Sequence, residues 1–305
     1  MRAILRNPLT AFDGRAGKAR SDELIRDAES RPWTRLEESD FAAARKVPSM
    51  LSDEELRFYF WIAQQLAATP GAIVDLGAFI GGSTAHLAAG SQAGGASDKL
   101  VFAFDHFAAT EKVKQKQLYA KGIARFEGDD FLNLSKRLLT PWAPQIKFRP
   151  GRIEEQSWKD GPISLLVLDV SKTTAVTDYV AKTFFPSLIP YESVIVQQDE
   201  LHWKEPWITA QMQRLANHFR AVCHIPGSAM VYLCTRRVGS LALRHARVAR
   251  LTDDQLLADL NASAERLAPF GVNAQIDRQK EALRLNPGMR KAWRFKNRPP
   301  RHTPR

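Results

Sequence analysis

The sequence has few cysteines and no long apolar run. Only two of its 305 residues are cysteine, too few for a disulfide framework. No apolar stretch reaches the roughly 18–20 residues that a membrane-spanning helix needs. Residues 1–20 lack the apolar core and the small-residue cleavage site of a secretory signal. We therefore expect a soluble, cytoplasmic protein, with Cys223 and Cys234 as reduced thiols that face each other across a hairpin.

Acidic residues are missing from the last part of the chain. Hydrophobic residues make up 44% and charged residues 25% of the sequence, so disorder is excluded for most of it. The formal net charge is +11, and seven of the basic residues lie in residues 289–305, which contain no acid; without them the chain carries +4. Trp293 and Phe295 stand between these cations, as in segments that stack on nucleic acid. Like-charge blocks are commonly solvated, so the pattern predicts a disordered tail.

Hydrophobic periodicity divides the chain into four parts. Residues 1–49 are polar and interrupted by proline, which predicts an irregular N-terminal extension. Residues 50–239 alternate apolar runs with amphipathic segments, which predicts an α/β domain with a parallel sheet covered on both faces. Residues 240–288 predict a helical appendage that packs on this domain or on a second subunit, which leaves a homodimer open. Residues 289–305 are the tail.

Seven apolar runs predict strands within the second part. They lie at residues 72–77, 99–105, 145–151, 161–169, 192–199, 219–225 and 229–236. The last two are separated only by Pro-Gly-Ser, which predicts an antiparallel hairpin. Ser52, followed by three acids, predicts the start of a helix before the first strand.

The most informative segment, VDLGAFIGGSTAHLA, follows the first predicted strand. Its glycines let a ligand approach the backbone, and the next helix offers unpaired N–H groups. The spacing matches neither a dinucleotide fingerprint nor a P-loop. Asp75 places a carboxylate beside the loop, which disfavours a pyrophosphate and suits a ligand with an ammonium group. Asp105 ends the second predicted strand, where an acid can hold a ribose diol.

This segment resembles motif I of class I S-adenosylmethionine-dependent methyltransferases, especially the catechol and macrocin types of O-methyltransferase. The resemblance covers roughly residues 50–238 and implies a Rossmann-like, doubly wound sheet of seven strands with an antiparallel last strand. Residues 168–208 are most similar to methyltransferase-like proteins without an assigned substrate. The resemblance also implies S-adenosylmethionine as the cofactor. The cofactor-binding residues that it implies are Asp75, Gly77, Ala78, Gly81, Ser83, Asp105 and Glu154.

Each of these residues has an expected role by the resemblance. Asp75 lies near the methionine amino group, the glycines with Ala78 and Ser83 surround the methionine part, and Asp105 takes the ribose hydroxyls. Glu154 contacts adenine, with Glu155 as the competing carboxylate, and Trp158 is a candidate stacking wall.

Acids also follow the fourth and fifth predicted strands. Asp169, Asp199 and Glu200 would form an oxygen-rich site that suits Mg²⁺, and Lys172 lies three residues after Asp169. A cation there would lower the pKa of an acceptor hydroxyl, and Lys172 would take the proton. Asp169 and Lys172 are therefore the candidate catalytic residues. Asp-x-x-Lys resembles the catechol-type pattern, but Glu200 stands where Asn or Asp is usual, which leaves metal dependence open.

Plainer interpretations of these residues also stand. Asp169 and Asp199 would contact the cofactor or cap strands without a metal, and Lys172 would be solvated or structural. His202 and Trp203 either line the acceptor site or have structural partners.

The leading hypothesis is methyl transfer to a hydroxyl of a small molecule or glycan. The alternatives are an RNA-directed methyltransferase that uses the basic tail and a non-catalytic, cofactor-binding homologue. Residues 106–145 predict an insertion that covers the acceptor pocket, and His86 is expected to be structural.

Overall fold

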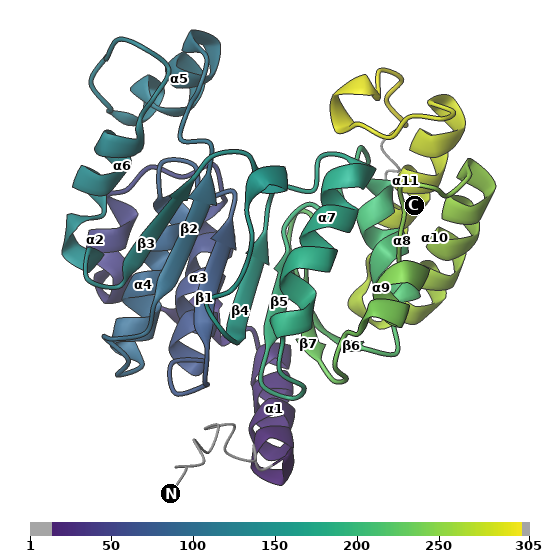
Figure 1. The fold of residues 1–305 in the computed structure, drawn as a ribbon, viewed down its shortest axis with the longest axis horizontal. Helices are drawn as coiled ribbons and strands as arrows, with labels where there is room; N and C mark the ends of the chain where they lie inside the picture. The colour runs from purple at the N-terminus through teal and green to yellow at the C-terminus, as the bar shows by residue number, and fades with distance from the viewer. Residues whose placement is uncertain (1–13, 301–305) are drawn as a thin grey trace, which may run out of the picture.

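A seven-stranded mixed sheet forms the centre of the computed structural model, which describes residues 14–300, with side chains from residue 17 (Figure 1). The strands are β1 (Ala72–Leu76), β2 (Val101–Asp105), β3 (Ile146–Pro150), β4 (Ile163–Leu168), β5 (Val194–Gln197), β6 (Phe219–Ile225) and β7 (Ala229–Cys234). Their order is β3-β2-β1-β4-β5-β7-β6, with β1 to β5 parallel and β7 antiparallel to both of its neighbours. The predicted Rossmann-like sheet with a closing hairpin is confirmed.

Strand order changes direction between β1 and β4. The chain first builds outward from β1 to β3 and then returns to place β4 on the other side of β1. The loops that leave β1 and β4 therefore diverge, and a ligand cleft forms between them at the carboxyl edge. This edge lies at the top of the sheet in Figure 1.

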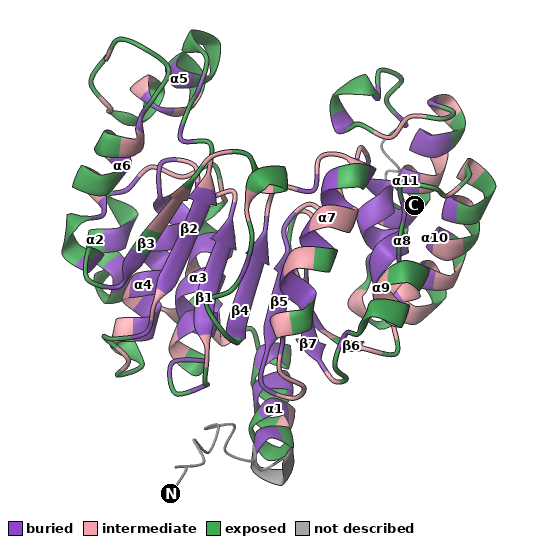
Figure 2. Cartoon of the chain, in the orientation of Figure 1, coloured by how far each residue is buried: buried purple, intermediate pink, exposed green. Residues whose placement is uncertain are grey.

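Helices cover both faces of the sheet, and burial is greatest in the strands between them (Figure 2). One face carries α1 (Gly14–Glu29), α2 (Ala42–Arg45), α3 (Asp53–Gln65), α4 (Gly82–Ala93) and α6 (Leu132–Leu138), while α5 (Glu111–Gln117) stands beyond the carboxyl edge of the sheet. The other carries α7 (Thr174–Phe184), α8 (Pro206–Arg214), α9 (Ser240–His245), α10 (Asp253–Leu267) and α11 (Asn273–Leu285). Neighbouring strand residues such as Ile73 and Val74 enter opposite cores, as strand alternation requires.

The N-terminal extension is more ordered than the sequence predicts. It contains α1, α2 and two short 3-10 turns, the first with Pro32 at its start. Trp33 is fully buried and packs against Phe58 and Trp61 at ring-centroid distances of 5.0 and 5.2 Å. Single aromatic residues, rather than a periodic stripe, anchor this segment to α3.

The helical appendage and the described part of the tail belong to the main core. Leu256 and Leu260 of α10 are fully buried in the core that also contains α7 and α8, so the appendage packs on the sheet domain. Phe295 is only 2% exposed and contacts Trp203 and Trp207. The prediction of a disordered tail is therefore wrong for residues 289–300, and residues 301–305 lie outside the described residues.

The two cysteines do not face each other across the hairpin. Cys223 pairs in register with Val231, whereas Cys234 pairs with Phe219. They enter opposite cores, and both are buried free thiols. Within residues 14–300, no helix has the length and apolar character to cross a membrane.

Candidate active site

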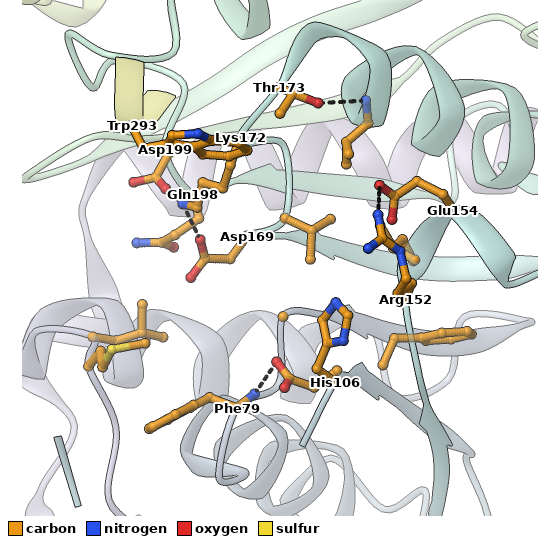
Figure 3. Close-up of a pocket in the computed structure, with 18 of the residues that line it drawn as sticks. Phe79, His106, Arg152, Glu154, Asp169, Lys172, Thr173, Gln198, Asp199 and Trp293 are labelled. Atoms are coloured by element: carbon orange, nitrogen blue, oxygen red, sulfur yellow. Dashed lines mark hydrogen bonds and ion pairs between the residues drawn. The ribbon is translucent and has the colours of Figure 1, made fainter. Parts of the chain in front are cut away.

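A cavity of about 640 Å³ opens at the carboxyl edge of the sheet (Figure 3). Gly77, Asp105, Asp169 and Asp199, which end or follow β1, β2, β4 and β5, all line it. A smaller hollow beside it shares Gly77 and Asp169 and is also lined by Asp75, Ala78 and Ser83. Carboxylates from distant parts of the sequence thus meet at one edge, as the strand pattern predicts.

Glycine is required where β1 and β4 come together. Gly77 has φ +97°, and a Cβ there would lie 2.8 Å from the carbonyl oxygen of Asp169. Its N–H donates to the carbonyl of Phe104 at 2.9 Å, which fixes the loop against β2. Gly81, at φ +108°, precedes α4 and lies against Leu139. Gly81 lines neither the cavity nor the hollow, so it shapes the loop from outside.

Asp75 is a buried carboxylate held by neutral donors. Its Oδ2 accepts hydrogen bonds from the Ser83 hydroxyl at 2.8 Å and the Thr84 hydroxyl at 2.7 Å. Burial raises the pKa of Asp75 to about 6, and the two hydroxyl bonds partly offset that rise. Ser83 therefore orients the acid rather than only lining the loop.

Asp105 is held by the backbone and lines the cavity. Its Oδ1 accepts from the Phe107 N–H at 2.7 Å, and its Oδ2 from the Phe79 N–H at 3.0 Å (Figure 3). Burial raises the pKa of Asp105, and these two N–H bonds oppose the rise. Each oxygen keeps a further lone pair, so the carboxylate can accept hydrogen bonds from two adjacent hydroxyls.

Lys172 joins the acids of the other two strands. Its ammonium donates to Asp169 Oδ1 at 2.8 Å and also to Asp199 Oδ2. The Lys172 side chain is 39% exposed and lines the cavity. Its carbonyl accepts from the N–H of Ala292 at 2.9 Å, so the C-terminal segment fixes the loop that carries it.

The position of Glu200 shows that the predicted metal site is wrong for this residue. It is fully buried, its Oε1 accepts from the Tyr232 hydroxyl at 2.5 Å, and burial raises its pKa to about 7. It does not line the cavity. Both residues lie in the turn that follows β5, and this turn directs Asp199 to the cavity and Glu200 into the core.

The predicted magnesium ligands therefore do not come together. An ammonium already lies between Asp169 and Asp199, and the third carboxylate is elsewhere. Across the part of the chain that the structure describes, no group of three or more His, Cys, Asp and Glu side chains is placed to hold a metal ion. The donor set does not fit Mg²⁺.

Of the three residues predicted to lie near adenine, only one lines the cavity. Glu154 lines the cavity and accepts from Arg152 Nη2 at 3.2 Å, whereas Glu155 does not line it. Trp158 packs on Phe102 at a centroid distance of 4.9 Å and is not a cavity wall. It belongs to the core instead.

His202, Trp203 and His86 each contact a residue of the protein itself and do not face the cavity. His202 pairs with Glu205, and Trp203 packs on Phe295; neither lines the cavity. His86 is fully buried against the carbonyl of Gly82 at 2.8 Å, and burial lowers its pKa to about 4, which agrees with a structural role.

The sequence did not predict several of the residues that line the cavity. Met50 and Trp293, 53% and 56% exposed, both line the cavity, although they are distant in the sequence. Glu55 lines it too and accepts from the Gln198 amide. The capping pattern at Ser52 predicts that a helix begins there and that Glu55 lies in its first turn. It does not predict that the Glu55 carboxylate faces a cavity. From the predicted covering insertion at residues 106–145, only His106 lines the cavity.

No protein-family model and no curated protein sequence matches this chain. Among solved structures, the O-methyltransferase NovP is 14% identical with a TM-score of 0.48, over 62% of this chain and 82% of NovP. CalS11, described as a TDP-rhamnose 3'-O-methyltransferase of calicheamicin biosynthesis, is 13% identical at 0.42, over 75% and 96%. The 23S rRNA methyltransferase ErmE is 13% identical at 0.36, over 81% and 96%.

The strand order of the chain itself carries the assignment of the fold. Five parallel strands, an antiparallel β7 inserted between β5 and β6, and a glycine loop after β1 occur together. This is the fold of the class I S-adenosylmethionine-dependent methyltransferases.

Proposed function

We propose that this protein transfers a methyl group from S-adenosylmethionine to a hydroxyl of a small molecule or glycan. One observation carries the proposal. Asp75 and Asp105 flank the glycine loop at the cavity edge, and neither forms an ion pair with a cation within the described residues. A cavity of about 640 Å³ lies in the range of ligand sites and has room for a cofactor and a small acceptor.

The residues present fit this cofactor. S-adenosylmethionine carries an ammonium group, a sulfonium and a ribose diol, and uncompensated carboxylates suit all three. Asp105 is assigned to the ribose, and Asp75, with Gly77, Ala78 and Ser83, to the methionine part. Glu154 is assigned to adenine, and Gly81 supports the loop. When bound, the cofactor supplies an electrophilic methyl carbon to the cavity.

The acceptor is assigned to the end of the cavity formed by β4 and β5. Of the Asp169 oxygens, Oδ1 receives the Lys172 ammonium, and Oδ2 carries no hydrogen bond within residues 17–300. We assign Asp169 Oδ2 to accept the proton of the acceptor hydroxyl. Lys172 holds that carboxylate in place and donates to the acceptor oxygen, which aligns the hydroxyl for in-line attack.

Calorimetric titration with S-adenosylhomocysteine tests the cofactor assignment. We expect one-to-one binding, and at least a tenfold loss of affinity for Asp105→Ala, since a charged hydrogen-bond acceptor is worth about 1.5–3 kcal/mol. Glu127→Ala, an exposed acid outside the cavity, is the matched control. The proposal would be contradicted if the wild type did not bind S-adenosylhomocysteine, or if Asp105→Ala bound it with full affinity.

A screen with labelled methyl donor tests the reaction itself. The acceptors are phenols, free sugars and glycosides, each assayed with EDTA and with Mg²⁺. We expect a hydroxyl-bearing acceptor to be labelled, and Asp169→Asn to lower kcat while leaving the affinity for S-adenosylhomocysteine unchanged. Cofactor binding without transfer to any hydroxyl would instead identify a non-catalytic binding protein.

A further inference from the structure

A second cavity, of about 450 Å³, lies outside the candidate active site. It is a groove between α7, α9 and the turn after α9, elements that lie next to each other in Figure 1. It shares no lining residue with the cavity at the carboxyl edge. Any ligand of this groove is therefore separate from the cofactor and the acceptor.

Three exposed cations line the groove. Lys182 projects from α7, and Arg244 and Arg247 come from α9 and the turn that follows it. Within residues 17–300, none of the three forms an ion pair with a carboxylate, whereas Arg214 of α8 pairs with Asp259 and Arg284 of α11 pairs with Glu281. Unpaired cations gathered in a concave site attract an anion.

The one acid in the groove does not neutralise it. Asp178 accepts hydrogen bonds from the N–H groups of Val248 and Ala249 at 2.8 and 3.0 Å, and from the Gln211 amide. Arg247 is near enough to lower the pKa of Asp178, yet burial raises it overall. Asp178 therefore fixes the turn that presents Arg247.

The sequence around the groove is also rich in positive charge. Residues 235–250 contain no acid and carry five arginines, which are Arg236, Arg237, Arg244, Arg247 and Arg250. All five are exposed. The positive field therefore extends beyond the groove and would steer an anionic ligand toward it.

The groove also offers an apolar surface. Ala175, Ala181, Leu243 and Tyr179 line it. Leu241, on the same short helix, is 73% exposed, more than any other large hydrophobic side chain of the described residues. A purely hydrated anion would gain nothing from these side chains, so the lining favours an anion attached to an apolar group.

We propose that this groove binds an organic phosphate. The phosphate lies against Lys182, Arg244 and Arg247, and the organic part covers Ala175, Ala181 and Leu243. Guanidinium groups match phosphate oxygens in paired hydrogen bonds, and a phosphate monoester carries nearly two negative charges at pH 7 for the three cations to share. The proposal does not depend on the methyltransferase assignment.

Phenyl phosphate is the first probe, titrated calorimetrically into the full chain. We expect one site, with at least tenfold higher affinity than for inorganic phosphate, because the ring adds apolar burial. The Arg244→Ala/Arg247→Ala variant should lose at least tenfold in affinity with an unchanged thermal midpoint, since both side chains are exposed. Lys112→Ala/Lys116→Ala removes two exposed cations of α5 and should bind normally.

Vesicles distinguish a lipid from a soluble source of the phosphate. If the natural ligand is a lipid, the protein should sediment with phosphatidylcholine vesicles that contain phosphatidic acid, and Leu241→Ser or the double arginine variant should abolish this. Phenyl phosphate binding without vesicle binding identifies a soluble ligand. Failure of both probes, or unchanged binding by the double arginine variant, would overturn the proposal.

Discussion

The β1–β2 and β4–β5 ends of the candidate site, taken as the cavity with its adjoining hollow, each hold two aspartates, but the partners of these aspartates differ. At the β1–β2 end, Asp75 and Asp105 are held by hydroxyls and backbone N–H groups, which leave the charge in place. At the β4–β5 end, Asp169 and Asp199 share the ammonium of Lys172. The choice of partner, and not the number of acids, decides whether an end of the cavity suits a cationic cofactor or an uncharged hydroxyl.

Phe295→Ala would disrupt the β4–β5 end most strongly. The ring is 2% exposed and anchors the segment that carries Trp293 and Ala292. We expect a loss of about 3–5 kcal/mol in the free energy of unfolding, measured by urea denaturation. Trp293→Ala, at a largely exposed side chain, should change it by less than about 0.5 kcal/mol. A loss below about 1 kcal/mol in Phe295→Ala would mean that the segment is held by other contacts.

Lys172→Ala would make the two ends alike. Without the ammonium, Asp169 and Asp199 are two partly exposed carboxylates facing one space, and stability should fall by about 1 kcal/mol. The variant should gain weak affinity for Mn²⁺, detected by calorimetry, and Lys172→Ala/Asp199→Asn should lose it again. Equal Mn²⁺ affinity in the wild type would contradict the view that Lys172 takes the cation position.

Acidification should weaken the β1–β2 end. With a pKa of about 6, Asp75 is mostly neutral at pH 5, so affinity for S-adenosylhomocysteine should fall about tenfold between pH 7 and pH 5. Asp75→Asn should bind weakly at both pH values.

Stability should respond to the same group in the opposite direction. The pKa of Asp75 rises on folding from an ordinary 3.8, so its stabilising contribution is complete below that value and is lost as pH rises through about 6. Denaturation of Asp75→Asn should lack this component. A wild-type affinity that does not change between pH 7 and pH 5 would contradict the assignment of Asp75 to the ammonium group.

Glu200→Gln should have the smallest effect, because Glu200 lies at neither end. The amide oxygen can still accept from Tyr232, and the substitution removes a buried charge that forms as pH rises through about 7. We expect a Tm increase of a few degrees at pH 8 and little change at pH 5. Loss of S-adenosylhomocysteine binding would place Glu200 in the site after all.

The β1–β2 end was predictable because its residues are close in the sequence and follow a strand–loop–helix pattern. Asp75, the glycine loop and Asp105 need only two parallel neighbours to meet. The β4–β5 end depends on contacts that no local pattern shows, such as the Ala292 N–H that donates to the Lys172 carbonyl and Trp293 lining the same cavity. The opposite directions of Asp199 and Glu200 were not predictable either, because both lie in the turn after β5 and not in the strand.

The order in which the chain is made bears on the link between Ala292 and Lys172. The loop that carries Lys172 leaves the ribosome long before the segment that later binds its carbonyl. The β1–β2 end of the site can therefore form during synthesis, while the β4–β5 end is completed only after the C-terminal segment has been made. A nascent chain that stalls before residue 290 would hold a nearly formed β1–β2 end beside an unfinished β4–β5 end.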